Sequence, residues 1–390
     1  MGNISKTLLN TVPLSEAELL LEKLISVNTI DPPGNERTLL PLIKYAFEKI
    51  RAKWYIVEKK KGRSNFIGKI GSGEPSVGFF AHLDTVPPGD GWRTDPFKPY
   101  LYNGRLYGRG AIDCKGNFVA AWAAIKTFLT LHSQFKGTIY LVGCADEETG
   151  SENGVIYLLK KGFNVDYAIV SDGGHYDKVI IGEKGIISLL IKSFGKQVHA
   201  SQPEKGINAV SHIITFLHEL DTLDFNGFKH DALFDGITKN IGVIKGGSAS
   251  NTVPAYAEAE IDIRYPLGVS KDDILTAIRH LEKKCKKKEP TMNITIQTVF
   301  TAQPHLINKN SPLMIKFLDS AKELHMDMQP VTMGGNTDAK PLTFAGIQSV
   351  VHGLKGSQTA HMANEFCTIE DIRKAAALYA LTLMKIFGVE

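Results

Sequence analysis

Five side chains that can hold a metal ion or move a proton stand at the ends of apolar segments or of a glycine-rich turn in this 390-residue chain. His82 ends an apolar run, and Asp84 follows two residues later. Asp113 ends a glycine-rich turn, and Glu147 and Glu148 follow directly on the stretch GTIYLVGCA. Imidazole and carboxylate groups are common ligands of catalytic metals, and a carboxylate beside them can act as general base. These residue types therefore suggest a site for a metal ion.

Two further residues extend this group. Asp172 follows the apolar segment AIV, and His361 lies in the loop after SVVH. Taken singly, none of these side chains is specific. A lone histidine is more often an ordinary surface or core residue, adjacent glutamates usually mark a solvated loop, and an aspartate before a helix is usually its cap. Together, H-x-D after a strand, G-R-G-x-x-D-x-K-G before a helix and D-E-E-x-G after the next strand form a specific combination.

The segments that carry these residues alternate between strand and helix patterns. The spacing predicts strands over 54–58, 65–70, 77–81, 138–145 and 167–170, and helices over 14–26, 39–50, 114–132 and 155–161. Continuous apolar strands separated by helices indicate an α/β fold with a mostly parallel sheet covered on both faces. Because the carboxyl ends of parallel strands share one edge, we expect the candidate residues to converge there.

A different pattern begins after Glu183. It predicts strand, helix, two half-buried strands, helix and strand over 186–193, 209–220, 241–245, 255–265, 271–285 and 293–298. This order is typical of a small ferredoxin-like α+β unit. We therefore predict a catalytic domain built from 1–183 and 301–390, where the α/β pattern returns, and an inserted domain over 184–300.

Composition argues against several other classes of protein. A net charge of +4 with 43% hydrophobic and 22% charged residues is typical of a soluble globular protein. No apolar run approaches the roughly 18 residues of a membrane span, and the start lacks a signal-peptide pattern, so we expect a cytoplasmic protein that binds no membrane. The basic run 283–288 ends a helical pattern and is interpreted as a solvated helix end rather than a nucleic-acid site. Four scattered cysteines predict no disulfide framework.

The motifs together resemble those of the M20 family of metallohydrolases, which includes deacylases, carboxypeptidases and dipeptidases. AHLDTVPPGDGW, GRGAIDCKG and ADEETG are similar to its three signature segments. GKQVHASQPEKGINAV and NTVPAYAEAEIDIRYP resemble segments of its lid domain, and GGNTDA and HMANEF resemble its C-terminal motifs. The resemblance implies a catalytic domain of zinc-exopeptidase type, and a lid domain that also forms a homodimer.

The resemblance also implies a site for two divalent metal ions. Asp113 would bridge them. His82 and Asp172 would complete one site, and Glu148 and His361 would complete the other. Imidazole and carboxylate ligands without thiolate suit zinc first, with cobalt or manganese as alternatives. Two such ions roughly 3.5 Å apart can lower the pKa of a shared water and polarise a scissile carbonyl.

The remaining site residues follow from the same motifs. Glu147 would be the general base, and Asp84 would orient the imidazole two residues before it. His199 would donate to the developing oxyanion from the partner subunit of the dimer. Asn251 and Arg264 match positions that contact the substrate's carboxylate, although both could equally be ordinary polar residues of a strand.

Three positions depart from the family pattern. Cys114 stands where methionine is usual, after a peptide bond that is cis in relatives, and AHMANE replaces G-H-x-x-D-E. Asp172 is typical of dipeptidases and aminopeptidases, whereas the length, the short lid and the segment 251–264 favour the deacetylase and desuccinylase branch. We predict an amide hydrolase that releases the acyl group of an N-acyl amino acid, of acetylornithine deacetylase or succinyl-diaminopimelate desuccinylase type. A dipeptidase or carboxypeptidase is the alternative.

Two hypotheses from other classes fit less well. A non-catalytic binding module would be expected to have lost a ligand or the base, and every one of these positions carries a competent side chain. A nucleotide-binding oxidoreductase would need a third glycine beyond Gly108 and Gly110, and an acidic partner for the ribose. The acyl group, the amino acid and the physiological metal stay open.

Overall fold

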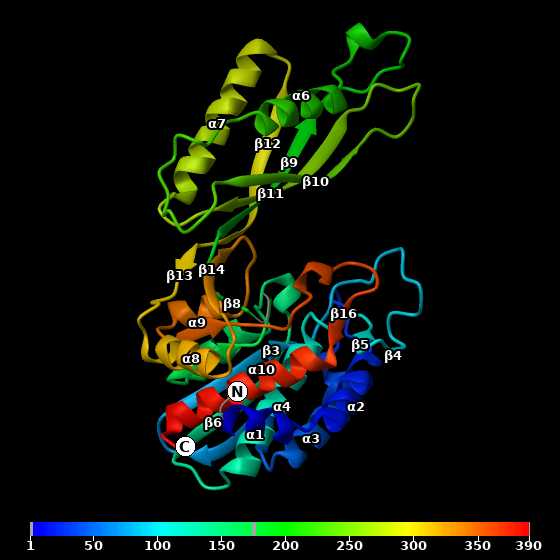
Figure 1. Ribbon diagram of the computed structural model, residues 1–390. Helices are drawn as coiled ribbons and strands as arrows, with labels where there is room; N and C mark the ends of the chain where they lie inside the picture. Colours follow the sequence, from blue (N-terminus) through cyan, green and yellow to red (C-terminus); the bar gives the residue numbers. More distant parts are fainter. Residues whose placement is uncertain (1–2, 174–176, 390) are drawn as a thin grey trace. The chain divides into compact units, whose positions relative to one another are not determined.

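A computed structural model describes residues 3–173 and 177–389 of the protein. The chain divides into two compact units (Figure 1). Unit 1 comprises the chain up to Ile181, the segment Ile307–Val331 and the chain from Thr337 onward, and unit 2 comprises Gly182–Leu306 and Thr332–Asn336. The domain boundaries expected at 183/184 and 300/301 stay predictions.

Nine strands of the described chain form the largest sheet, in the order β1-β2-β6-β3-β7-β15-β8-β13 with β14 paired to β8. Their bounds are β1 (Lys53–Glu58), β2 (Ser64–Ser72), β3 (Ser76–His82), β6 (Gly137–Cys144), β7 (Tyr167–Val170), β8 (Lys178–Glu183), β13 (His305–Leu306), β14 (Gln329–Met333) and β15 (Gln348–Val351). The neighbours β6, β3, β7 and β15 run parallel, and β1, β2, β8 and β13 join antiparallel. The predicted α/β fold is confirmed.

Helices cover both faces of this sheet. Consecutive residues of a strand point to opposite faces. The ring of Phe79 lies 5.6 Å from Tyr379 of α10, whereas the ring of Phe80 lies 6.0 Å from Phe163 in the chain that follows α5. The helix α9 also contacts β7 and β15. The helix α4 is buried along most of its length against β3, α2 and α10, as expected for a helix that is apolar all round. The helices of unit 1 are α1 (Asn3–Thr11), α2 (Leu14–Ile25), α3 (Leu40–Lys49), α4 (Lys115–Leu131), α5 (Val155–Lys160), α8 (Pro312–Glu323), α9 (Ala339–Phe344) and α10 (Ile369–Phe387).

A small separate sheet holds the loop that leads to Asp113. Its strands β4 (Tyr100–Tyr102) and β5 (Arg105–Tyr107) form a hairpin, and β16 (Phe366–Thr368) pairs antiparallel with β5. Directly after β5, the N–H of Gly108 donates to the carbonyl oxygen of Glu365 at 3.0 Å. The chain that precedes α4 is therefore tied to the chain that follows His361, far away in the sequence.

Unit 2 is an antiparallel sheet with two helices. In chain order its main elements are β9 (Gly185–Phe194), α6 (Ala209–Asp221), β10 (Thr238–Gly246), β11 (Tyr256–Tyr265), α7 (Lys271–Lys288) and β12 (Asn293–Ala302). The sheet order is β10-β11-β9-β12, and every neighbouring pair is antiparallel. Ile187 and Ile191 of β9 pack in one cluster with Ile213 of α6 and Ile278 of α7. The predicted ferredoxin-like βαββαβ unit is confirmed.

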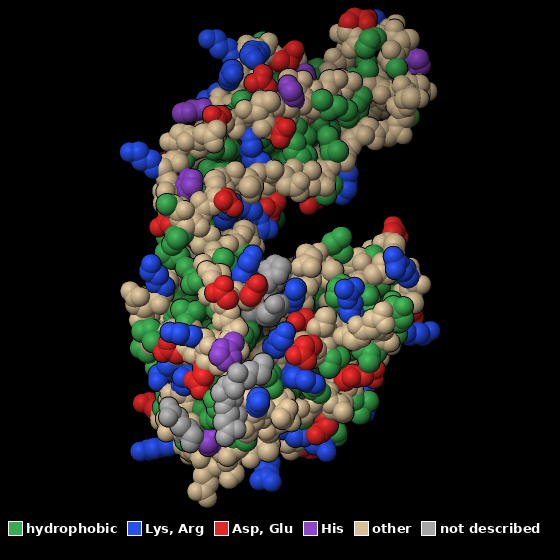
Figure 2. Space-filling model, viewed as in Figure 1, with side chains coloured by type: hydrophobic (Ala, Val, Ile, Leu, Met, Phe, Trp, Pro, Cys, Tyr) green, Lys and Arg blue, Asp and Glu red, His purple; other side chains and the backbone are tan. Residues whose placement is uncertain are grey.

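The basic run 283–288 forms the last turns of α7. Lys and Arg side chains gather over this end of the helix in Figure 2, with acidic side chains among them. Lys284 and Lys288 lie 3.7 and 2.9 Å from carboxylate oxygens of Glu219 on α6. These exposed cations also suit the negative end of the helix dipole. Of the helices in the described ranges, none combines the length and the apolar character needed to cross a membrane.

Candidate dinuclear metal site

The carboxyl edge of the four parallel strands carries the candidate ligands. His82 is the last residue of β3, and Asp172 comes two residues after β7. Glu147 and Glu148 begin a single 3-10 turn after β6, and His361 lies in the loop after β15. Because these four strands are neighbours in the sheet, their ends deliver imidazole and carboxylate groups to one rim. The sequence-based expectation of convergence is met by all of these residues.

The first group of candidate ligands includes Asp113 and His82. The Nε2 atom of His82 lies 2.9 Å from Asp113 Oδ1. Ligand atoms of His82, Asp113, Asp172 and Cys114 all lie within 4.8 Å of one another. His82, Asp172 and Cys114 are buried, so this group is shielded from bulk water.

The second group surrounds the other oxygen of Asp113. The Nε2 atom of His361 lies 3.1 Å from Asp113 Oδ2 and 3.1 Å from Glu148 Oε2. These three side chains also lie within 4.8 Å of one another, and 57% of the His361 side chain is exposed. Asp113 therefore belongs to both groups through different oxygens, which is the arrangement that a bridging ligand needs.

Asp84 and Glu147 lie directly beside these groups. The Asp84 carboxylate accepts the backbone N–H of Glu147 at 3.3 Å and that of Glu148 at 3.1 Å. The Nδ1 atom of His82 lies 3.1 Å from the Asp84 carbonyl oxygen and 3.6 Å from its carboxylate. Asp84 thus positions both the imidazole and the two glutamates. A carboxylate oxygen of Glu147 lies 4.0 Å from His82 Nε2, and its side chain is 9% exposed.

The other three predicted residues belong to unit 2. His199 and Asn251 are neighbours, because the N–H of Ala200 donates to the Asn251 carbonyl oxygen at 2.9 Å. Arg264 lies near the end of β11, whereas the strand begins at Tyr256. At a rise of about 3.3 Å per residue, these two positions are about 26 Å apart along the strand. Its guanidinium holds both oxygens of Asp262, at 2.6 and 3.0 Å. Unit 2 therefore brings His199 and Asn251 together and keeps Arg264 apart.

Comparison with known proteins identifies the family to which this chain belongs. Residues 78–385 match the model of peptidase family M20/M25/M40. The chain belongs to this family. A succinyl-diaminopimelate desuccinylase of Nautilia profundicola is 30% identical over 373 residues, which cover 92% of this chain and 96% of that protein. The protein is thus an M20 metallohydrolase that acts on amide or peptide bonds.

Solved M20 structures share the fold. A dipeptidase of Saccharomyces cerevisiae superposes with a TM-score of 0.80 at 15% identity, over 100% of this chain and 99% of that one. A dinuclear metal-binding M20 peptidase of Bacillus subtilis superposes with a TM-score of 0.68 at 13% identity, over 97% and 99% of the two chains. At these identities the likeness concerns the fold alone.

The M20 site fits two divalent cations on its own chemistry. Burial raises the pKa of Asp172 to about 7, with the carboxylates of Asp113 and Asp338 adding to the effect. Burial likewise raises the pKa of Glu147. Among the described residues, the buried Oε1 atom of Glu148 has no hydrogen-bond partner. Crowded carboxylates and an unpartnered buried oxygen are what a site built around positive ions would show.

Metal binding by this M20 enzyme is expected to strengthen as pH rises. Hydrogen bonds to Asp113 and Glu148 raise the pKa of His361 to about 10, so without metal the imidazole keeps its proton at neutral pH. A metal ion needs the neutral ring and must displace that proton. Affinity should therefore grow from pH 6 toward the pKa of His361. Calorimetric zinc titrations at pH 7 in two buffers of different ionisation enthalpy should show proton release, and less of it in His361→Ala. An affinity without pH dependence would contradict the assignment.

Glu365 is a positioning residue that the sequence did not reveal, although it lies in HMANEF. Its fully buried carboxylate accepts the backbone N–H groups of Gly110, Ile112 and Asp113 at 3.1, 2.9 and 3.1 Å. It also pairs with the guanidinium of Arg109. The loop that presents Asp113 is thus fastened around one carboxylate. The only signal in the sequence was its place four residues after His361.

Glu365→Gln is expected to weaken metal binding about 10- to 100-fold, which is typical when a group that orients a ligand is lost. The amide has nearly the same shape, but it turns one acceptor into a donor among N–H groups and removes the partner charge of Arg109. Competition with a chromophoric chelator measures the affinity. Glu370→Gln is a matched control, because Glu370 is an exposed residue of α10 paired with Arg373 at 3.5 Å. Unchanged affinity in Glu365→Gln would remove its assigned role.

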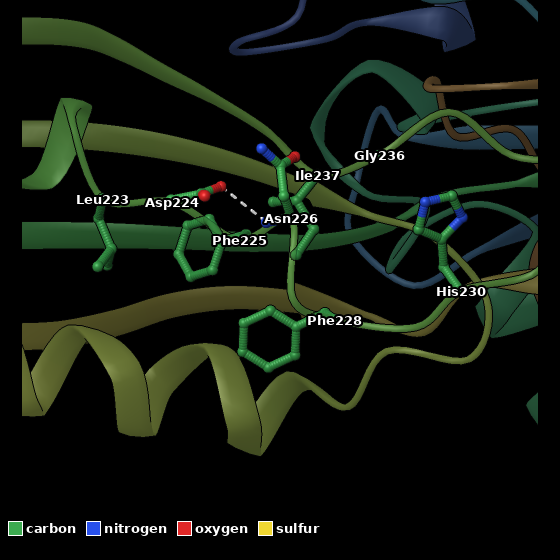
Figure 3. Close-up of a pocket in the computed structure, with 8 residues that line it drawn as sticks. All are labelled: Leu223, Asp224, Phe225, Asn226, Phe228, His230, Gly236 and Ile237. Carbon is green, nitrogen blue, oxygen red and sulfur yellow. Dashed lines mark hydrogen bonds between the residues drawn. The ribbon is translucent and has the colours of Figure 1, made fainter.

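A cavity elsewhere in unit 2 contains none of the predicted site residues. It measures about 200 Å³ and lies in the loop before β10. Figure 3 shows Phe225, Phe228 and His230 around it, with Asp224 accepting the N–H of Asn226 at 2.8 Å. His230 Nδ1 lies 2.9 Å from the Asp231 carbonyl oxygen. The Asp224 carboxylate and the His230 ring therefore form hydrogen bonds with the backbone of the same loop.

Proposed function

We propose that the protein is a two-metal hydrolase that releases the acyl group of N-acyl amino acids, with zinc as the first choice of metal. The observation that carries this proposal is the pair of ligand groups that share Asp113, with Glu147 beside them on a buried rim. The acyl substrate class is supported by the desuccinylase relative, which matches this chain over nearly its full length. The acyl group itself is left to experiment.

The residues of unit 1 would divide the work between holding metal and moving a proton. His82, Asp172, Glu148 and His361 would hold the ions, and Asp113 would link them. Ions held there would supply Lewis acidity and would lower the pKa of a water molecule. Glu147 would take the proton of that water on a carboxylate oxygen and return it to the leaving amine. Burial raises the pKa of Glu147, which makes its carboxylate a better proton acceptor.

Residues of unit 2 would bind the substrate and the developing oxyanion. The backbone N–H of Ser201 donates to Nδ1 of His199 at 3.1 Å, which places the proton of the neutral ring on Nε2. His199 can therefore donate from Nε2. His199 and Asn251 adjoin each other while Arg264 stands far along β11, so a site that uses all three needs two copies of the chain. This geometry supports the proposed homodimer.

A dipeptidase is the second candidate, and one residue favours it. Asp172 has the shorter of the two acidic side chains that the family uses at this position, and the solved S. cerevisiae relative is a dipeptidase. Both reactions break an amide bond through the same groups, so the metal site does not discriminate between them. The difference lies in whether the substrate carries an acyl group or a free amine beside the scissile bond.

A substrate screen on protein loaded with zinc or cobalt tests the proposal. N-acetyl and N-succinyl amino acids are compared with dipeptides of the same amino acids. Turnover of the acylated series with little on dipeptides is expected, and Glu147→Gln, prepared in parallel, reports any contaminating activity. Turnover of dipeptides alone would make the second candidate correct. Failure to bind two metal ions would overturn both.

A further inference from the structure

Cys114 belongs to the metal site by position, although an imidazole and carboxylate ligand set does not include it. Its Sγ atom is one of the four ligand atoms that lie within 4.8 Å of one another, with those of His82, Asp113 and Asp172. Its thiol contacts the His82 imidazole and donates to the Ser171 carbonyl oxygen at 3.0 Å. The peptide bond between Asp113 and Cys114 is cis.

The spacing suits a four-coordinate ion. Zinc–sulfur bonds of about 2.3 Å and zinc–nitrogen or zinc–oxygen bonds of about 2.0–2.2 Å separate tetrahedral ligands by about 3.3–3.8 Å. Four atoms already gathered within 4.8 Å need only small side-chain shifts to meet that geometry. Without sulfur, the first group offers three protein ligands. With sulfur it offers four, from an imidazole, two carboxylates and a thiolate.

The other cysteines show what an ordinary buried thiol looks like in this chain. Cys144, Cys285 and Cys367 are buried as well. None of these three joins a group with metal-ligand spacing among the described residues. Burial of a small apolar side chain therefore accounts for them. It does not account for a thiol placed against a histidine and two carboxylates.

We propose that Cys114 is a direct thiolate ligand of the metal ion held by His82, Asp113 and Asp172, so that the two ions occupy unlike sites. The S–H bond breaks, its proton passes to the buffer, and a sulfur–metal bond forms without any change of oxidation state. A soft thiolate favours zinc or cobalt over manganese or magnesium at this site, whereas Asp113, Glu148 and His361 form a harder one. This proposal rests on the metal site of the proposed function.

Cobalt and zinc serve as the probes. Thiolate-to-cobalt charge transfer absorbs in the near ultraviolet, and nitrogen or oxygen ligands give no such band. The protein loaded with two cobalt ions is expected to show this band, saturating with one of the two equivalents. Cys114→Ser should lose it, and Cys367→Ser, which removes an equally buried thiol of unit 1, should keep it. X-ray absorption of the zinc-loaded natural protein should show a sulfur neighbour at about 2.3 Å, averaging one sulfur per two zinc ions.

The outcomes separate this proposal from the proposed function. A protein that binds two ions and turns over substrate without a sulfur signal in either spectrum overturns the thiolate ligand alone. A band that persists in Cys114→Ser also overturns it. A protein that binds no metal overturns both. Because the zinc spectrum needs no variant, misfolding of Cys114→Ser leaves the test intact.

Discussion

Replacing Glu147 with glutamine is expected to lower kcat about 10²- to 10⁴-fold, the contribution typical of a positioned general base. The carboxylate lies 4.0 Å from His82 and outside both ligand groups, so its loss should remove proton transfer and leave the ions in place. Turnover and metal content, measured on the same preparation, test both halves of the expectation. Two bound ions with little turnover is the expected pair of results.

Two variants in the same loop sharpen this test. Glu148→Gln alters a proposed metal ligand one residue away and should lose an ion as well as activity. Glu152→Gln makes the same chemical change at an exposed residue paired with Lys59 at 2.9 Å, and should behave like the natural protein. If Glu147→Gln retains activity, another group moves the proton. If it loses metal, Glu147 is a ligand.

Arg63→Met is expected to destabilise unit 1 by about 3–5 kcal/mol, the usual cost of removing one partner from a buried ion pair. The Arg63 guanidinium contacts carboxylate oxygens of Asp31 at 2.7 Å, Glu36 at 2.7 Å and Asp146 at 2.9 Å, and all four side chains are buried. Burial already raises the pKa of Glu36 to about 7, against the effect of Arg63. Without the arginine, three buried acids would face one another.

Tryptophan fluorescence isolates this effect, because Trp54, Trp92 and Trp122 all lie in unit 1. Urea unfolding followed by this signal should shift to much lower denaturant in Arg63→Met. Arg37→Met is the matched control: Arg37 is half-exposed, lies 3.4 Å from Glu58, and should change stability by no more than about 1 kcal/mol. Equal midpoints for the two variants would show that the cluster is not a structural centre.

The same cluster also positions the loop that carries Glu147 and Glu148. Asp146 has φ of 70°, in the left-handed region, and stands directly before Glu147. Its carboxylate accepts from Thr149 at 2.8 Å and from the backbone of Asn153 at 2.7 Å, besides Arg63. The turn that presents the two glutamates is therefore bent around an anchored side chain. Arg63→Met should lower activity even where the protein stays folded.

The convergence of the candidate ligands could be predicted from the sequence because most of them, unlike Asp113, stand at or just after the end of a strand with a strong apolar pattern. That rule places His82, Glu148 and Asp172 on one edge without any knowledge of contacts. The clusters around Glu365 and Arg63 could not be predicted in this way. Their members come from segments far apart in the chain, and a charged residue in a loop gives no sign of burial before the loop is closed.

Small elements were also beyond the sequence pattern. β4, β5 and β16 have three residues each, too few for an alternation of apolar and polar residues to stand out. The sequence pattern predicts the six-residue helix α5 but not α9, which has the same length. The longer strands and helices of the large sheet and of unit 2 have enough residues for the spacing of their apolar residues to be recognised. The loop that presents Asp113 depends on the short strands β5 and β16, so its arrangement could be seen only in the structure.

The position of β15 has a consequence for synthesis of the chain. This strand lies between β7 and β8 in the sheet, yet it is translated after all of unit 2, and His361 and Glu365 follow later still. Unit 2, which is nearly continuous in sequence, can complete its fold on the ribosome, whereas unit 1 must wait with a gap in its sheet for the last part of the chain. His361 would therefore join the other candidate ligands only after unit 2 and β15 have been made.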